Sequence, residues 1–259
     1  MTSLARLITI PLSHYCEKAR WGLDRVVLPY REEPHVPLLH RFVTARNDGG
    51  TVPMLVHGDT RLVDSTEILV HADADRGGGL LYPRDPELRR EVDALEERFD
   101  TELGPHTRRW AYAHLLQESG LLRQLWSHGA PRLEASLLPV LVPIARGLVR
   151  MGYRISPESG QRSLERVRGV FRDVDQRLYD GRRFLVGERF TAADLTFAAL
   201  AAPVLFPEGC RAAAPALDAV PDKMREDILI MRNSEAGRFA MRLFLQERGT
   251  RAPLDVADR

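Results

Sequence analysis

Apolar and polar residues follow two different patterns along this chain. Over about the first 75 residues, short apolar runs of strand length alternate with stretches in which apolar residues recur at helical spacing. The order that this pattern predicts is strand 4–10, helix 15–27, strand 30–36, short helix 38–45, strand 53–57, strand 61–63 and helix 65–75. The first part of the chain is therefore predicted to be an α/β unit of order βαβαββα.

Beyond residue 86 the apolar residues recur at helical spacing, and no strong strand signal returns. Three consecutive glycines, at 77–79, and two nearby prolines interrupt the pattern between the two parts. Helices are predicted over 87–116, 158–179, 195–205 and 222–248, the first with a kink at Gly104-Pro105. We therefore predict a domain over 1–76, a linker over 77–86 and an all-helical domain over 87–259.

An apolar stretch over 137–149 is interrupted by Pro139, Pro143 and Arg146. It is shorter than the roughly 20 apolar residues that a membrane-spanning helix needs. It is interpreted as one or two buried helices that enlarge a pocket. The alternative is a surface that lies on a membrane or against a partner subunit, and membrane contact is not expected.

Thr191 and Asp194 have the spacing of a capping box, and Phe190 and Leu195 are placed as its hydrophobic staple. The following helix is almost wholly apolar, which predicts that it is buried. These residues are expected to stabilise the fold and not to take part in catalysis.

Composition and charge set limits on the function. The 259 residues suffice for two packed domains, and the net charge of +1 gives no reason to expect a nucleic-acid partner. The two cysteines, Cys16 and Cys210, are far apart in the sequence and do not indicate a disulfide framework. The first residues do not have the form of a secretory leader, and no Cys or His cluster has zinc-site spacing. A cytoplasmic protein without a metal is therefore predicted.

The candidate catalytic and binding residues lie in the turns that connect strands to helices. Ser13, in the sequence Ser13-His14-Tyr15-Cys16, stands between the first strand and the first helix. A hydroxyl there can cap the helix, beside free backbone N–H groups that favour a thiolate. The alternative is that Ser13 only caps the helix and has no role in binding or catalysis. Two further turns carry Thr51-Val52-Pro53 and Asp64-Ser65.

As a set, Ser13, Val52-Pro53 and Asp64-Ser65 resemble the thioredoxin-like domain of the cytosolic glutathione transferases, in particular the zeta, theta and omega classes. The resemblance implies that Ser13 donates a hydrogen bond to the glutathione sulfur. It implies that the Val52-Pro53 bond is cis and that Val52 pairs through its backbone with the cysteinyl part. It further implies that Asp64 meets the γ-glutamyl ammonium and Ser65 the γ-glutamyl carboxylate.

The resemblance also implies roles for residues around this set. Thr51 completes the glutathione site at a position where the family often has Lys or Gln. Tyr15 borders the sulfur as an alternative hydroxyl donor, and His40 is expected to be solvated. In the family, a helix of the second domain lines the pocket for the electrophilic substrate. The candidates for this pocket, together with Tyr15, are Arg109, Trp110 and Tyr112.

The predicted function is that of a cytoplasmic, homodimeric glutathione transferase that attacks a hydrophobic electrophile, as the family's detoxification enzymes do. Conjugation, dehalogenation, epoxide opening and isomerisation all remain open as the reaction. One alternative is a non-catalytic protein that binds apolar ligands in the same cleft. Another is a redox role for Cys16, which the sequence more readily explains as a small apolar core residue.

Overall fold

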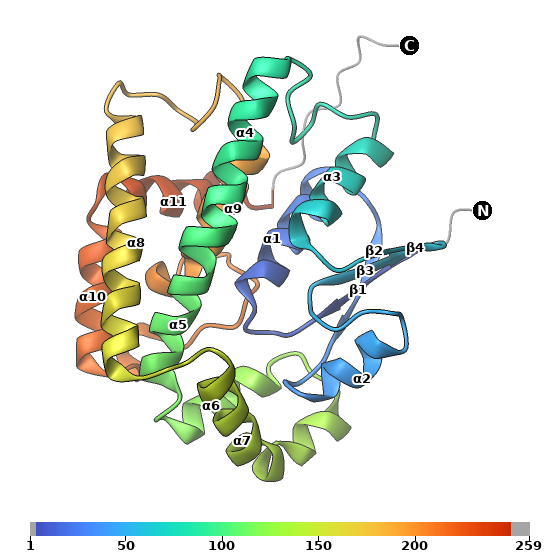
Figure 1. Ribbon diagram of the computed structural model, residues 1–259, viewed down its shortest axis with the longest axis vertical. Helices are drawn as coiled ribbons and strands as arrows, with labels where there is room; N and C mark the ends of the chain where they lie inside the picture. Colours follow the sequence, from blue (N-terminus) through green and yellow to red (C-terminus); the bar gives the residue numbers. More distant parts are fainter. Residues whose placement is uncertain (1–3, 250–259) are drawn as a thin grey trace.

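The computed structural model describes residues 4–249, and a sheet and a group of helices share one buried core (Figure 1). The elements of the first part are β1 (Ala5–Thr9), α1 (His14–Arg25), β2 (Tyr30–Pro34), α2 (Leu39–Ala45), β3 (Met54–His57), β4 (Thr60–Leu62) and α3 (Ser65–Asp75). Those that follow are α4 (Pro86–Arg98), the π-helical segment η1 (Phe99–Leu103), α5 (Gly104–Leu115), α6 (Ser119–Ser127), α7 (Arg132–Gly152), α8 (Pro157–Leu178), α9 (Ala192–Leu205), the 3-10 turn η2 (Leu217–Ala219), α10 (Asp222–Arg232) and α11 (Glu235–Gln246).

The four strands form one mixed sheet in the order β2-β1-β3-β4. β1 is parallel to β2 and antiparallel to β3, which in turn is antiparallel to β4. Helices α1 and α3 pack against each other beside this sheet (Figure 1). The predicted βαβαββα order is confirmed as a thioredoxin-like arrangement. The outermost parts of the predicted domains, residues 1–3 and 250–259, lie outside the described residues.

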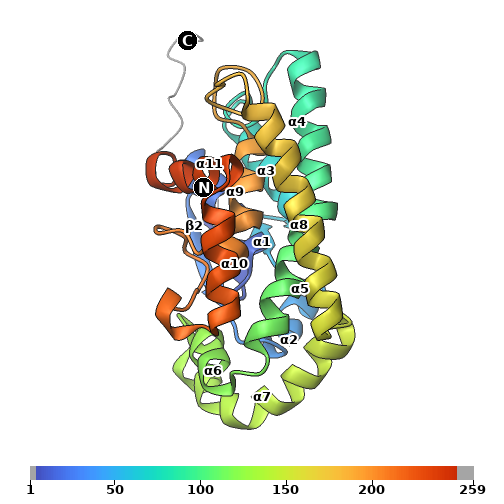
Figure 2. The same cartoon turned by 90° about the vertical axis from the view of Figure 1, so that its left-hand side faces the viewer.

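The rest of the described chain is mostly helical, as predicted. α8 runs alongside α5, and α9 lies at the centre (Figure 2). α9 is buried on nearly all sides, in agreement with its almost uniformly apolar sequence. Asp194 accepts hydrogen bonds from the Thr191 backbone N–H at 2.8 Å and from the Leu185 N–H at 2.7 Å. The capping role of Thr191 and Asp194 is thus confirmed.

The long helix predicted over 87–116 is interrupted at η1, just before the predicted kink. The interruption is a widened π-helical turn that leads directly into the turn of α5 that contains Pro105.

The helix predicted over 222–248 is divided into α10 and α11, which meet at Asn233-Ser234. Ser234 caps α11 by accepting a hydrogen bond from the Gly237 N–H at 3.0 Å. A side chain at position 237 would collide with the Met231 carbonyl, so the tight turn between the helices requires glycine there.

The apolar stretch around 137–149 is part of a single helix, α7, which continues through both prolines. Its buried side carries Leu138, Val142 and Ala145. The exposed side carries a row of large apolar side chains: Leu133, Leu137, Val140, Ile144, Leu148 and Met151. The expectation of buried helices is therefore wrong for most of this segment, although its C-terminal end does border a cavity.

By length and composition, α7 is the one helix among residues 4–249 that could cross a membrane. It has 21 residues, because the helix extends beyond the apolar stretch at both ends, and 17% of its most apolar window is buried. A single helix of this kind is weak evidence for a membrane protein.

Candidate functional site

The three turns that carry the predicted site residues meet at one edge of the sheet. Ile8 pairs with Met54, so the end of β1 lies beside the turn that leads into β3. Leu55 pairs with Leu62, so β4 ends and α3 begins at that same edge. The strand register thus brings together three short motifs that are far apart in the sequence.

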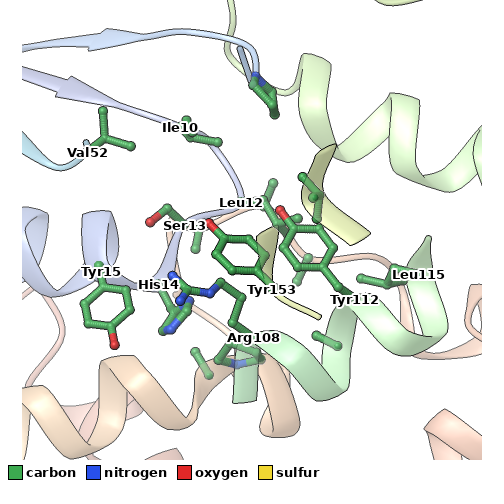
Figure 3. A pocket seen from close by; sticks show the side chains of 18 of the residues that line it. Ile10, Leu12, Ser13, His14, Tyr15, Val52, Arg108, Tyr112, Leu115 and Tyr153 are labelled. Carbon is green, nitrogen blue, oxygen red and sulfur yellow. The ribbon is translucent and has the colours of Figure 1, made fainter. Parts of the chain in front are cut away.

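Ser13 is the N-cap of α1, and its Oγ accepts a hydrogen bond from the Cys16 backbone N–H at 3.3 Å. The side chain is half-buried and lies at the wall of a cavity (Figure 3). A hydroxyl that accepts one hydrogen bond still has its own O–H to donate. Ser13 therefore presents a donor, beside the positive end of a helix dipole, to anything that occupies this cavity.

The cavity has a volume of about 430 Å³ and lies between the sheet edge and the helical part of the chain. Its wall comes from the start of α1, from α2, from α5, from the end of α7 and from the segment that follows α9. Most of the lining side chains are apolar, as in pockets that bind small organic molecules.

The Val52-Pro53 peptide bond is cis, as the resemblance implied. Thr51 and Val52 line the cavity, whereas Pro53 is buried behind them. The backbone of Val52 is thus placed at the cavity wall, near Ile10 and Ser13 (Figure 3).

Asp64 is the N-cap of α3, and its Oδ1 accepts hydrogen bonds from the Thr66 N–H at 2.8 Å and the Glu67 N–H at 3.1 Å. The carboxylate is exposed, and Ser65 beside it is 3% exposed at the first position of the helix. Neither residue lines the apolar cavity itself. They lie outside the cavity, in a separate polar region at the same edge of the sheet. This region combines the N-terminus of α3 with the carboxylate of Asp64.

Tyr15 also borders the cavity, but its hydroxyl donates a hydrogen bond to the Asp100 carbonyl at 2.9 Å. Figure 3 shows this hydroxyl on the side of the ring that faces away from Ser13. Burial also raises the pKa of the phenol far above its usual value. Of the two hydroxyls that the sequence offered, that of Tyr15 donates to a backbone carbonyl, whereas that of Ser13 lies at the cavity wall.

The predicted pocket residues of α5 lie on different sides of the helix. Tyr112 lines the cavity, together with Arg108 and Leu115. Arg109 does not: it donates to the Tyr153 carbonyl at 2.9 Å. Trp110 is 1% exposed and belongs to the core. These two placements correct the sequence expectation.

Helical spacing explains the difference. Residues 108, 112 and 115 are separated by four and three positions and share one face of α5, whereas 109 and 110 point elsewhere. Arg108, Tyr153 and His14 are therefore cavity residues that the sequence analysis missed. Counting back from Tyr112 by one helical turn would have found Arg108.

His14 is buried, and its Nε2 lies 3.0 Å from the Gly104 carbonyl oxygen. Burial, with a smaller contribution from the positive charge of Arg108, lowers the pKa of His14 to about 3. The ring is therefore neutral at neutral pH, and Nε2–H is the donor to that carbonyl. His14 connects the start of α1 to the start of α5 across the site.

His40 lines the cavity in a half-buried position, and its Nδ1 is buried without a hydrogen-bond partner among residues 4–249. Burial lowers the pKa of this imidazole to about 4. The expectation that His40 is solvated is therefore wrong. The exposed guanidinium of Arg41 borders the same end of the cavity.

Cys16 is completely buried, and burial raises the pKa of its thiol. It does not line the cavity, whereas Cys210 does. Burial also raises the pKa of the Cys210 thiol strongly, so neither cysteine has the environment of a reactive thiolate. Within the part of the chain that is described, no group of three or more His, Cys, Asp or Glu side chains could hold a metal ion.

Comparisons with known proteins agree with this geometry. A family model described as the glutathione S-transferase N-terminal domain matches residues 7–79. Residues 7–79 are therefore similar to the N-terminal domain of glutathione S-transferases, and the fold of the whole chain is one that solved glutathione S-transferases share. No sequence among the curated proteins matches the chain.

Several solved structures share the fold along nearly their whole length. A glutathione S-transferase from Xanthobacter autotrophicus is 18% identical, with a TM-score of 0.61 over 96% of this chain and 97% of that one. The beta-etherase LigF from Sphingobium is 16% identical, with a TM-score of 0.60 over 93% and 99%. A possible glutathione S-transferase from Rhodopseudomonas palustris is 17% identical, with a TM-score of 0.58 over 95% and 96%. At these identities the likeness shows the fold, not the reaction.

Proposed function

We propose that this protein is a glutathione transferase in which Ser13 activates the glutathione thiol for attack on an electrophile in the apolar cavity. The observation that carries the proposal is the position of the Ser13 hydroxyl. It lies at the N-terminus of α1, at the wall of the cavity and beside the cis Val52-Pro53 turn. The superfamily fold of the chain supports glutathione as the co-substrate.

The residues at this edge fit the parts of glutathione. The backbone of Val52 pairs with the cysteinyl part in the manner of an added strand. The N-terminus of α3 at Ser65 binds the γ-glutamyl carboxylate, and the exposed Asp64 carboxylate binds the ammonium group. His40 and Arg41, which line the cavity, would bind the glycyl carboxylate and so compensate for Thr51 at a position where the family often has Lys or Gln.

Ser13 would act on the sulfur. A free thiol has a pKa of roughly 8.5, so lowering it by about two units requires roughly 2.7 kcal/mol of preferential stabilisation of the thiolate. One hydroxyl donor and one helix N-terminus are adequate for this. The thiol proton leaves to solvent, a sulfur–carbon bond forms, and the electron pair of the broken bond departs with the leaving group or stays on the opened ring.

Glutathione binding is tested by thermal unfolding with reduced glutathione, in wild type and in Asp64→Asn. Asparagine caps a helix as well as aspartate does, so this variant removes the charge and retains the cap. Asp85→Asn is the matched control, because Asp85 caps α4 in the same way, accepting from the Glu87 N–H at 2.9 Å and the Leu88 N–H at 3.0 Å.

Glutathione at a hundred times its dissociation constant should stabilise wild type and Asp85→Asn by about 2.7 kcal/mol, and Asp64→Asn by much less. No stabilisation of wild type at millimolar glutathione would contradict the proposal. Tight binding of apolar probes with no turnover of any electrophile would favour the non-catalytic alternative, which the largely apolar wall of the cavity allows.

A further inference from the structure

Arg108 places a positive charge in the wall of an otherwise mostly apolar cavity. It projects from α5, and Figure 3 shows its side chain between His14 and Tyr153, on the side of the cavity across from Val52. A guanidinium is always protonated and carries five N–H donors. Such a group is seldom buried unless an anion accompanies it.

The contacts of Arg108 do not include an anion. Its guanidinium carbon lies 4.1 Å from the centre of the Tyr153 ring and 5.8 Å from that of Tyr15. Its Nε is buried without a hydrogen-bond partner, and no carboxylate within residues 4–249 forms a salt bridge with it. Contact with an aromatic ring stabilises the cation but satisfies none of its in-plane donors.

Arg108 is half-buried, and arginines of the described chain with more deeply buried side chains are paired with carboxylates. Arg20 lies 2.7 Å from Glu32, and Arg248 lies 2.7 Å from Glu17. Arg25 is held in the same way by Glu247. Arg108 thus differs from these arginines in having no acidic partner among the described residues.

The neighbouring titratable groups do not neutralise this charge. His14 stays neutral, because burial and Arg108 itself lower its pKa. Burial raises the pKa of Tyr112 to about 12, and it also raises that of Tyr15. At neutral pH the guanidinium of Arg108 therefore remains a positive charge in the cavity wall, next to apolar and aromatic side chains.

We propose that Arg108 binds a carboxylate carried by the electrophile, so that the protein selects aromatic or aliphatic electrophiles with an acidic group. This proposal rests on the function proposed above, because it concerns the second substrate of the same site. A planar guanidinium with unused donors matches the two oxygens of a carboxylate. The apolar wall around Arg108 then covers the remainder of the molecule.

Binding is measured first, because it does not depend on catalysis. The probes are 3,5-dinitrobenzoate and its methyl ester, titrated calorimetrically into wild type, Arg108→Gln, Arg108→Lys and Arg109→Gln, with and without glutathione. We expect Arg108→Gln to weaken binding of the carboxylate about 30-fold and to change binding of the ester several-fold at most. Arg108→Lys should recover part of the loss, and Arg109→Gln should retain the preference of wild type.

Equal losses for acid and ester in Arg108→Gln, or no loss for either, would overturn the proposal. Thermal unfolding of each variant shows whether it is folded at the temperature of the titration. If glutathione fails to bind, the proposed transferase function fails, while the comparison of acid and ester still decides the role of Arg108.

Turnover provides the second readout, with 4-chloro-3,5-dinitrobenzoate and its methyl ester as substrates. The thiolate forms a bond to the ring carbon, chloride leaves with the electron pair of the carbon–chlorine bond, and the thiol proton goes to solvent. The ratio of kcat/KM for acid over ester should fall at least tenfold in Arg108→Gln. An unchanged ratio, or a parallel loss for both substrates, would show that Arg108 does not select the carboxylate.

Discussion

The Nζ atom of Lys18 lies 2.6 Å from Oδ2 of Asp100, and the lysine side chain is completely buried. This ion pair joins α1 of the sheet-containing part to the π-helical segment η1 between α4 and α5. Lys18 also lies 3.0 Å from Glu96 and donates to the Thr66 hydroxyl at 2.7 Å. One amino group thus connects α1, α3 and the helical part directly behind the site.

Lys18→Met should destabilise the protein by about 3–5 kcal/mol, because it leaves Glu96 and Asp100 as buried carboxylates without their counter-ion. The measurement is urea-induced unfolding at pH 7. Lys223→Met is the matched control. Lys223 is the other lysine of the chain, and its side chain is 63% exposed, so its loss should cost less than about 1 kcal/mol. Similar losses in both variants would show that the buried network contributes little.

Ser13→Ala should lower turnover at least tenfold, while glutathione binding largely survives, because the sulfur loses its hydroxyl donor and the rest of the site remains. The change also removes the cap of α1, at a cost of about 1 kcal/mol of stability. Ser234→Ala separates the two effects, since Ser234 caps α11 away from the cavity. It should lose the same stability and keep full turnover. Unchanged turnover in Ser13→Ala would exclude the proposed role.

Cys16→Ala should retain turnover and glutathione binding, because the thiol is buried outside the cavity and burial raises its pKa. We expect a loss of stability of about 1 kcal/mol, from the small volume removed. Kinetics and thermal unfolding of the variant check both points. A loss of thiol-dependent activity with an unchanged melting temperature would revive the redox role.

His14 should make the protein less stable in mild acid. The unfolded chain takes up a proton near pH 6.5, whereas the folded protein does so only near pH 3. The unfolded state therefore binds more protons between these values, and stability falls as the pH falls through this window. The loss between pH 7 and pH 5 is about 2 kcal/mol.

His14→Gln tests this, because the glutamine amide can still donate to the Gly104 carbonyl but does not titrate. Its free energy of unfolding should decline less than that of wild type between pH 7 and pH 5. The same decline in both proteins would mean that folding does not lower the pKa of His14.

Ser13, Val52-Pro53 and Asp64-Ser65 could each be identified in the sequence because each motif is local, and the family resemblance related them to one another. Caps, a proline before a strand and a polar turn before a helix are properties of a few consecutive residues. The same holds for Thr191 and Asp194, whose capping box depends on a spacing of three. Periodicity likewise predicted the order of strands and helices along the first part of the chain and most of the later helices.

The wall of the cavity could not be predicted in this way. Which side of α5 faces Ser13 depends on how α5 packs against α8 and α9, and this packing places Arg108 at the cavity and buries Trp110. The packing of the chain likewise determines that the Tyr15 hydroxyl is hydrogen-bonded to the Asp100 carbonyl. It also determines that His40 is half-buried. The sequence by itself determined most of the elements and the candidate site residues at the sheet edge, because hydrophobic periodicity and capping act over short distances along the chain. Only the tertiary structure decided which charge faces the cavity, because that depends on contacts between helices far apart in the sequence.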